Sequence, residues 1–123
     1  MVTIQQLSAE FAKDAIQFSA NLKSIGEFEI ASQLKRSATS VGANIREAQS
    51  ASSRKDFLNK LLIASKESHE TMYWIDLVSA ISKIDESDRE VILKKAKAVH
   101  YLLQRIIMTT KSNMNRPEFK SRK

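Results

Sequence analysis

The chain contains very few residues that interrupt a helix, and this feature constrains its fold most. Its 123 residues include 2 Gly and 1 Pro, and the single proline, Pro117, lies close to the C-terminus. A sheet fold needs many turn residues, whereas long helices need few. A chain of this length is also large enough to bury a core as one domain. The sequence therefore predicts an all-α domain made of long helices.

Four segments repeat apolar residues every three or four positions, as helices with one buried face do. We expect helices at about Thr3 to Ile25, Glu27 to Gln49, Arg54 to Ser82 and from a Ser87 cap to about Lys111. The expected apolar stripes are Phe11, Ala15, Phe18, Leu22 and Ile25; Ile30, Leu34, Val41, Ile45 and Ala48; and Ile92, Ala96, Val99, Leu103 and Ile106. Short connections between helices of similar length favour an antiparallel up-down-up-down four-helix bundle.

Helix ends are predicted from local residue types. Gly26 follows the first helix and supplies a permissive residue for its end. Ser53 with Asp56, and Ser87 with Glu90, have the three-residue spacing of capping pairs. We therefore expect the third and fourth helices to begin at these serines.

The third predicted helix is apolar around much of its girth. Leu61, Leu62 and Ile63 are consecutive, and Tyr73 and Trp74 point about 100° apart on a helix. A helix of this kind is buried on more than one side, which predicts contact with another subunit. A thick single core with some exposed Leu is the alternative.

Gly42, among small residues of the second helix, predicts close packing against the first or third helix, with a local bend as the alternative.

The net charge of +6 is unevenly distributed. Residues 1–82 carry 9 basic and 9 acidic residues, residues 83–110 carry 6 and 4, and residues 111–123 carry 5 and 1. We predict a helical domain over residues 1–111 and a flexible basic tail over residues 112–123. Such tails bind nucleic acid or simply solubilise a chain end. The candidate phosphate contacts are Lys94, Lys95, Lys97, Lys111, Arg116, Lys120, Arg122 and Lys123.

Several polar residues fall within the second and third predicted helices. They are Asn44, Glu47, Lys66, Glu67 and Glu70. Lys66 and Glu70 have the spacing of a helix salt bridge, and Glu67 shares a face with Glu70. These residues could form a carboxylate-rich site, but we favour a structural hydrogen-bond network that fixes helix register.

The sequence gives an enzyme no positive support. A di-iron bundle needs Glu-x-x-His on two helices, whereas Lys66 and Lys97 stand three residues before His69 and His100, the two histidines of the chain. With 0 Cys and 2 Gly, thiol chemistry, cysteine-zinc sites and a glycine-rich phosphate loop are excluded. The N-terminus lacks the features of a secretory signal, and apolar runs are too short to span a membrane. We expect a cytoplasmic, non-enzymatic protein without cofactor or metal.

The segment QLKRSATSVGANIREAQSA, followed by SRKDFLNKLLIASKESHETMYWIDL, resembles the signature of a bacterial four-helix-bundle family. That family includes proteins encoded within intervening sequences of 23S rRNA genes, also called ribosomal protein S23, and is related to accessory proteins of diversity-generating retroelements. The similarity spans about Phe11 to Lys111. Its most specific motifs are Gln33-Leu34, Arg36-Ser37, Asn44-Ile45, Glu47-Ala48, Asp56-Phe57, Lys60, Lys66-Glu67, Glu70-Thr71 and Tyr73-Trp74.

The resemblance implies an antiparallel bundle that assembles into a ring, typically a homopentamer. Similarity to the retroelement accessory proteins implies a basic ring that binds nucleic acid and a reverse transcriptase. Similarity to the 23S rRNA intervening-sequence proteins implies a ribosomal component as partner. Five copies at +6 would carry +30.

Two functions remain open: an oligomeric nucleic-acid-binding accessory protein, with basic residues on the fourth helix and tail, or a scaffold that binds another protein. The acidic residues Asp85, Glu86, Asp88 and Glu90 would favour the scaffold if they interrupt the basic face.

Overall fold

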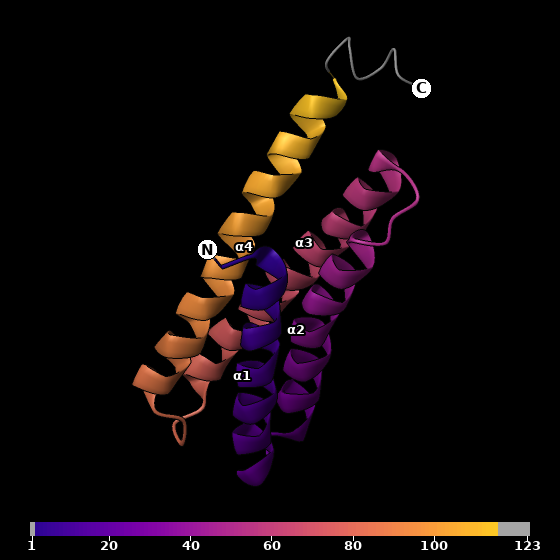
Figure 1. Cartoon of the computed structure of the whole chain (residues 1–123). Coiled ribbons are helices and arrows are strands. Elements are labelled where there is room, and N and C mark those ends of the chain that lie inside the picture. The colour runs from indigo at the N-terminus through magenta and orange to yellow at the C-terminus, as the bar shows by residue number, and fades with distance from the viewer. Residues whose placement is uncertain (1, 116–123) are drawn as a thin grey trace.

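The structure of the chain, a computed structural model, describes residues 2–115 and consists of helices without strands over that range. The helices are α1 (Ile4–Ser24), α2 (Phe28–Ala48), α3 (Arg54–Leu77) and α4 (Glu86–Met114), with a short 3-10 turn, η1 (Val78–Ala80), after α3. Figure 1 shows that consecutive helices are joined by short connections. The prediction of an all-α chain with four helices is confirmed.

The helices enclose one core because each packs against two neighbours. α1 and α3 each contact both α2 and α4. The core contains large aliphatic side chains from all four helices, among them Leu22, Leu34, Ile45, Leu61 and Leu103, which are at most 1 % exposed. Burying a side chain of this size stabilises a fold by roughly 1.5–3 kcal/mol. The last turns of α4 lie at the same end of the molecule as the α2–α3 connection (Figure 1).

The predicted apolar stripes form the core, with small shifts at their ends. The central members of each stripe are buried, whereas Ile25, Ile30 and Ile106 are only partly buried. Ile107 lies in the core in place of Ile106. These two residues are adjacent and both apolar, so periodicity alone could not decide which one faces inward.

Gly26 follows the end of α1, as expected. Gly26 has φ 90°, in the left-handed region that favours glycine. Its amide N–H donates to the Lys23 carbonyl oxygen at 3.0 Å, and the amide of Glu27 donates to the Leu22 carbonyl oxygen at 3.0 Å. This pair of hydrogen bonds is a Schellman motif, which satisfies two carbonyl groups at the helix end.

The predicted cap of α3 is confirmed, and that of α4 is wrong. The Ser53 side chain accepts a hydrogen bond from the Asp56 amide at 3.0 Å. At α4, Asp85 is the capping residue, and its carboxylate accepts from the Ser87 amide at 3.1 Å. Ser87 therefore lies inside the first turn of α4. An Asp two residues upstream of Ser87 is as good a cap as the serine.

α3 and α4 also end at different residues than predicted. α3 ends at Leu77 and not near Ser82, because the chain tightens into η1 and places Val78 in the core at 1 % exposure. The Ser79 hydroxyl donates to the Asp76 carbonyl oxygen at 2.7 Å, a side-chain bond that competes with the helix. α4 continues to Met114, beyond the expected end near Lys111. The predicted tail falls largely outside the described residues.

Gly42 lies against α1, one of the two helices predicted to approach it. A Cβ atom added at Gly42 would lie 3.7 Å from the carbonyl oxygen of Ser8, an ordinary contact distance. The approach of α1 is therefore close, but within this chain it does not require glycine.

Candidate nucleic-acid interface

The outward side of α4 carries a stripe of basic and aromatic residues. Lys94, Lys97, Tyr101 and Arg105 are spaced three, four and four residues apart, so they share one side of the helix. All four are exposed, Tyr101 at 62 %. Ile92, Ala96 and Val99, on the opposite side of α4, are in the core. We refer to Lys94, Lys97, Tyr101 and Arg105 as the basic stripe.

A shallow hollow of about 540 Å³ lies along the N-terminal part of this stripe, from Lys94 to Tyr101. It is lined by Arg89, Glu90, Leu93, Lys94, Lys97, Ala98 and Tyr101. The lining combines the apolar side chains of Leu93 and Ala98 and the ring of Tyr101 with three basic side chains and one acidic one, Glu90. Every lining residue belongs to α4, so the hollow is a surface feature of one helix and not a cleft between helices.

The cations of the basic stripe are available for anions. Lys94, Lys97 and Arg105 form no ion pair with any residue between 2 and 115. Lys95 differs, because its Nζ atom lies 2.6 Å from Asp14 Oδ2 on α1. The structure therefore separates Lys95 from Lys94 and Lys97. Lys95 lies three residues after Ile92 and four before Val99, both in the predicted apolar stripe, and this spacing could have placed it beside the core-facing side of the helix.

Arg105 belongs to the basic stripe but was not among the contacts predicted from the sequence. It stands alone in the sequence, away from the lysine cluster at 94–97, and composition gave it no special weight. Arg105 follows Tyr101 by four residues and Lys97 by eight, and this helical spacing could have predicted that it shares a side of the helix with them.

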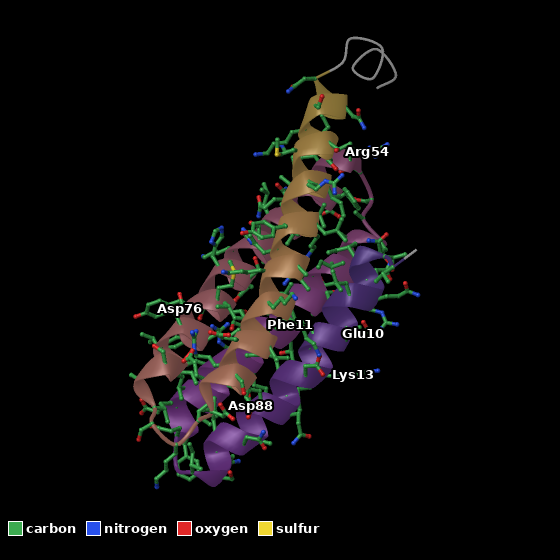
Figure 2. The ribbon with its side chains drawn as sticks, turned by 90° about the vertical axis from the view of Figure 1, so that its left-hand side faces the viewer. Glu10, Phe11, Lys13, Arg54, Asp76 and Asp88 are labelled. Atoms are coloured by element: carbon green, nitrogen blue, oxygen red, sulfur yellow. The ribbon has the colours of Figure 1, made fainter. Side chains whose placement is uncertain are left out.

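Acidic residues occur at the beginning of α4. Asp85 caps α4, and Glu86 and Asp88 lie in its first turn. Figure 2, which faces α4, shows Asp88 at this end of the molecule, whereas Arg54, the first residue of α3, is toward the opposite end. Arg89 is neutralised there by Glu86 at 2.5 Å and Asp76 at 3.7 Å. Glu90 alone borders the hollow. The acidic groups thus adjoin one end of the basic stripe and leave Lys94 to Arg105 uninterrupted by acid.

The remaining predicted contacts extend toward the C-terminus. Lys111 is exposed in the last turns of α4. Arg116, Lys120, Arg122 and Lys123 lie outside the described residues.

The polar residues of α2 and α3 form separate contacts and not one continuous network. Arg36 contacts both Glu70 and Glu67, the latter at 3.5 Å. The Trp74 indole N–H donates to Glu70 Oε1 at 3.3 Å. Oε1 of Glu67 is buried and forms no hydrogen bond with the described residues. Arg36 is therefore the centre of this cluster, although in the sequence it stood out only as part of a family motif.

Glu47, Asn44 and Lys66 lie apart from that cluster. Glu47 Oε1 lies 3.0 Å from Lys60 Nζ and so links α2 to α3. The Asn44 side chain donates to the Ser40 carbonyl oxygen at 2.9 Å, within α2. Lys66 is exposed and pairs with none of residues 2–115. The expected Lys66–Glu70 salt bridge is absent from this range because Glu70 contacts Arg36.

The two histidines meet between α3 and α4. Their ring centroids are 4.5 Å apart with an interplanar angle of 73°. Burial lowers the pKa of His100 from 6.5, and the nearby His69 lowers this pKa further. His100 is therefore favoured in its neutral form, because charging it would cost desolvation and repulsion.

Residues 2–115 offer neither a cluster of metal ligands nor a membrane-spanning helix. No group of three or more His, Cys, Asp or Glu side chains there could hold a metal ion. No helix in this range has both the length and the apolar character needed to cross a membrane.

Over residues 2–115, the fold and these surfaces define an all-α protein of four helices with an exposed basic stripe. The chain belongs to the family of 23S rRNA-intervening sequence proteins, whose model matches residues 2–105. The family assignment predicted from the motifs in α2 and α3 is thus confirmed.

A solved structure agrees with this assignment. The chain is similar to a protein of unknown function of the S23 ribosomal protein family from Bacteroides thetaiotaomicron, with 40% sequence identity and a TM-score of 0.82. The similarity covers 85% of this chain and 98% of that protein. No curated protein matches the chain in sequence. These relationships define a family of unknown function, without an assigned catalytic activity.

Proposed function

We propose that this chain is a non-enzymatic accessory protein of the cytoplasm that binds RNA or DNA through phosphate contacts. The basic stripe of α4, with Lys111 and the basic residues beyond it, would supply these contacts. The observation that carries the proposal is that Lys94, Lys97 and Arg105 project from one side of α4 without an acidic partner among the described residues.

The spacing of these cations suits a nucleic-acid backbone. Arg105 lies eleven positions after Lys94, which corresponds to about 16 Å along a helix axis. Long flexible side chains at this spacing can reach several phosphates of one strand. Because such contacts read no base edge, binding would depend weakly on sequence and steeply on salt. The exposed ring of Tyr101 could add one stacking contact.

The proposed architecture is an antiparallel up-down-up-down four-helix bundle. Contacts between α2 and α3 support it, because Arg36 lies near Glu67 and Glu70 whereas the later residue Glu47 lies near the earlier residue Lys60. Contacts between α3 and α4 follow the same order. Ser65 contacts Gln104 at 2.5 Å, and Ser68 contacts His100 at 2.8 Å.

We further propose that the chain assembles into a ring-shaped homo-oligomer, with five copies as the number implied by family resemblance. The support is an apolar strip on the outer side of α3, formed by Leu62, Ile63, Tyr73 and Leu77, which are 39–55 % exposed. The strip consists of two apolar pairs, Leu62 with Ile63 and Tyr73 with Leu77, on either side of the exposed Lys66, and exposed apolar groups of this kind mark interaction surfaces. Five copies would bring five basic stripes together and strengthen binding to one long strand. The mass of the native particle, measured by light scattering, tests this proposal; a monomer at micromolar concentration would contradict it.

A scaffold that binds another protein is the second candidate function. The same strip on α3 favours it, since a partner such as a reverse transcriptase or a ribosomal component could cover these residues. The scaffold requires no nucleic-acid binding.

Fluorescence anisotropy separates the two candidates. Labelled single strands and duplexes of RNA and DNA would be titrated with the full-length protein and with a version that ends at Asn115, so that α4 is kept whole. The nucleic-acid proposal predicts binding at low salt that weakens as salt is raised, and weaker binding by the shortened protein. No binding of any of these probes at low salt would overturn it and favour the scaffold.

A further inference from the structure

Both histidines of this chain lie side by side between α3 and α4, although they come from different helices. His69 is exposed and His100 is partly buried. Their ring centroids are 4.5 Å apart, and their planes are inclined by 73°. Two imidazoles at this separation can approach the same ion if their unprotonated nitrogens are free.

One hydrogen bond orients His100. Its Nδ1 atom lies 2.8 Å from the Ser68 hydroxyl oxygen. Ser68 is 4 % exposed and donates its hydroxyl proton to the Ser65 carbonyl oxygen at 2.9 Å. A hydroxyl has one proton, so both hydrogen bonds form together only when the Ser68 hydroxyl accepts from His100. His100 then carries its proton on Nδ1, and its Nε2 atom keeps a free lone pair.

We propose that His69 and His100 form a binding site for a first-row transition-metal ion such as Zn²⁺. The two imidazole nitrogens would be the protein ligands, and water would fill the other positions. Ser68 would be a positioning residue, because a hydrogen bond to the second ring nitrogen fixes the orientation and tautomer of a ligating histidine. This inference does not depend on nucleic-acid binding.

The observed separation is close to what such a site requires. Zn–N bonds are about 2.0–2.1 Å long, and with tetrahedral angles the centroids of two ligating imidazoles lie roughly 5 Å apart. The centroid separation therefore needs to grow only slightly from 4.5 Å, and the rings must turn from their edge-to-face contact so that one nitrogen of each faces the ion. The exposed His69 ring can make this adjustment by rotating, while His100 stays on Ser68.

The site would be an open and exchangeable one. A structural zinc site has four protein ligands, whereas no group of three or more potential ligands occurs within residues 2–115. The composition makes the test clean, because 0 Cys and no third His compete for the ion.

The test is isothermal titration of the metal-free, full-length protein with ZnCl₂. We expect one ion per chain. His69→Gln should abolish the binding while the circular-dichroism spectrum stays unchanged, because His69 is exposed. Ser68→Ala should weaken binding about tenfold, the lower end of the effect of losing an orienting partner. Asn59→Gln, exposed on the same helix, is the matched control and should bind as the original chain does.

A second readout reports the nitrogen atoms directly. In ¹⁵N spectra of the imidazoles, metal-free His100 should show the Nδ1–H tautomer, and Zn²⁺ should shift its Nε2 resonance. The proposal is overturned if the original chain binds Zn²⁺ no more tightly than His69→Gln, or if Zn²⁺ leaves both Nε2 resonances in place.

Discussion

Single polar residues within the packed helices have specific partners, and His100 is the most informative of them. It is partly buried, hydrogen-bonded to Ser68 and adjacent to His69 and Tyr101. The sequence located both histidines on helices but could not show that they meet. That contact depends on the register between α3 and α4, which helical periodicity within one segment does not contain.

We predict that the metal-free protein loses stability as the pH falls through the range just below 6.5. Burial and His69 lower the pKa of His100 in the folded chain, so the unfolded chain binds more protons in this range. The free energy of unfolding therefore decreases as pH falls toward the folded pKa, and this contribution is complete above about 6.5. Urea unfolding at several pH values with a chelator present measures the effect. A pH dependence that is the same in His100→Gln and the original chain would contradict it.

Trp74 provides a second test at this scale. The side chain packs against the core, and its indole N–H donates to Glu70. Because it is only partly buried, Trp74→Ala should lower the free energy of unfolding by about 2–3 kcal/mol, somewhat below the cost at a fully buried site. Tyr73→Ala is the control: Tyr73 is 55 % exposed and its loss should affect assembly more than folding. Equal melting temperatures and equal particle masses for the original chain and Trp74→Ala would refute this role.

At the scale of helices, the existence and type of all four elements followed from the sequence, whereas their ends followed only in part. Apolar periodicity is a repeated signal, so one exception does not hide it. An end depends on one or two residues. The cap at Ser53 was correct, but Asp85 displaced Ser87 at α4, and burial of Val78 ended α3 early. These ends depend on competition between nearby residues.

The two glycines should respond oppositely to replacement by alanine. Gly42→Ala should stabilise the folded chain by about 0.5–1 kcal/mol, because alanine favours a helix interior. The added Cβ meets Ser8 at an ordinary distance. Gly26→Ala should destabilise by roughly 1–2 kcal/mol, because alanine is strained in the left-handed conformation at φ 90°. Thermal unfolding of the two variants measures both. Loss of stability at Gly42→Ala would indicate a closer contact there, such as one between subunits.

At the scale of the whole molecule, the family and the four-helix composition were predictable, and the candidate interface was predictable only in part. Lys94 and Lys97 share an exposed side of α4 as a helical pattern allows. Lys95, a predicted contact, forms an ion pair with Asp14. Arg105, which was not predicted, is exposed on the same side of α4 as Lys94 and Lys97. Charge counting locates a basic region, but only the placement of the core shows which cations point away from it.

The measurement that tests the central proposal most directly is the salt dependence of nucleic-acid binding after removal of the stripe's charges. The variant is Lys94→Gln, Lys97→Gln, Arg105→Gln. Its control, Lys13→Gln, Lys23→Gln, Lys35→Gln, loses the same charge from exposed positions of α1 and α2. Anisotropy with a short single-stranded RNA, over a range of salt concentrations, gives the slope of log K against log salt. Each lost phosphate contact reduces the slope by about 0.7.

We predict a slope reduced by about 2 for the stripe variant, and a slope near that of the original chain for the control. Equal slopes and equal affinities for the two variants would contradict the assignment of the interface to the outward side of α4.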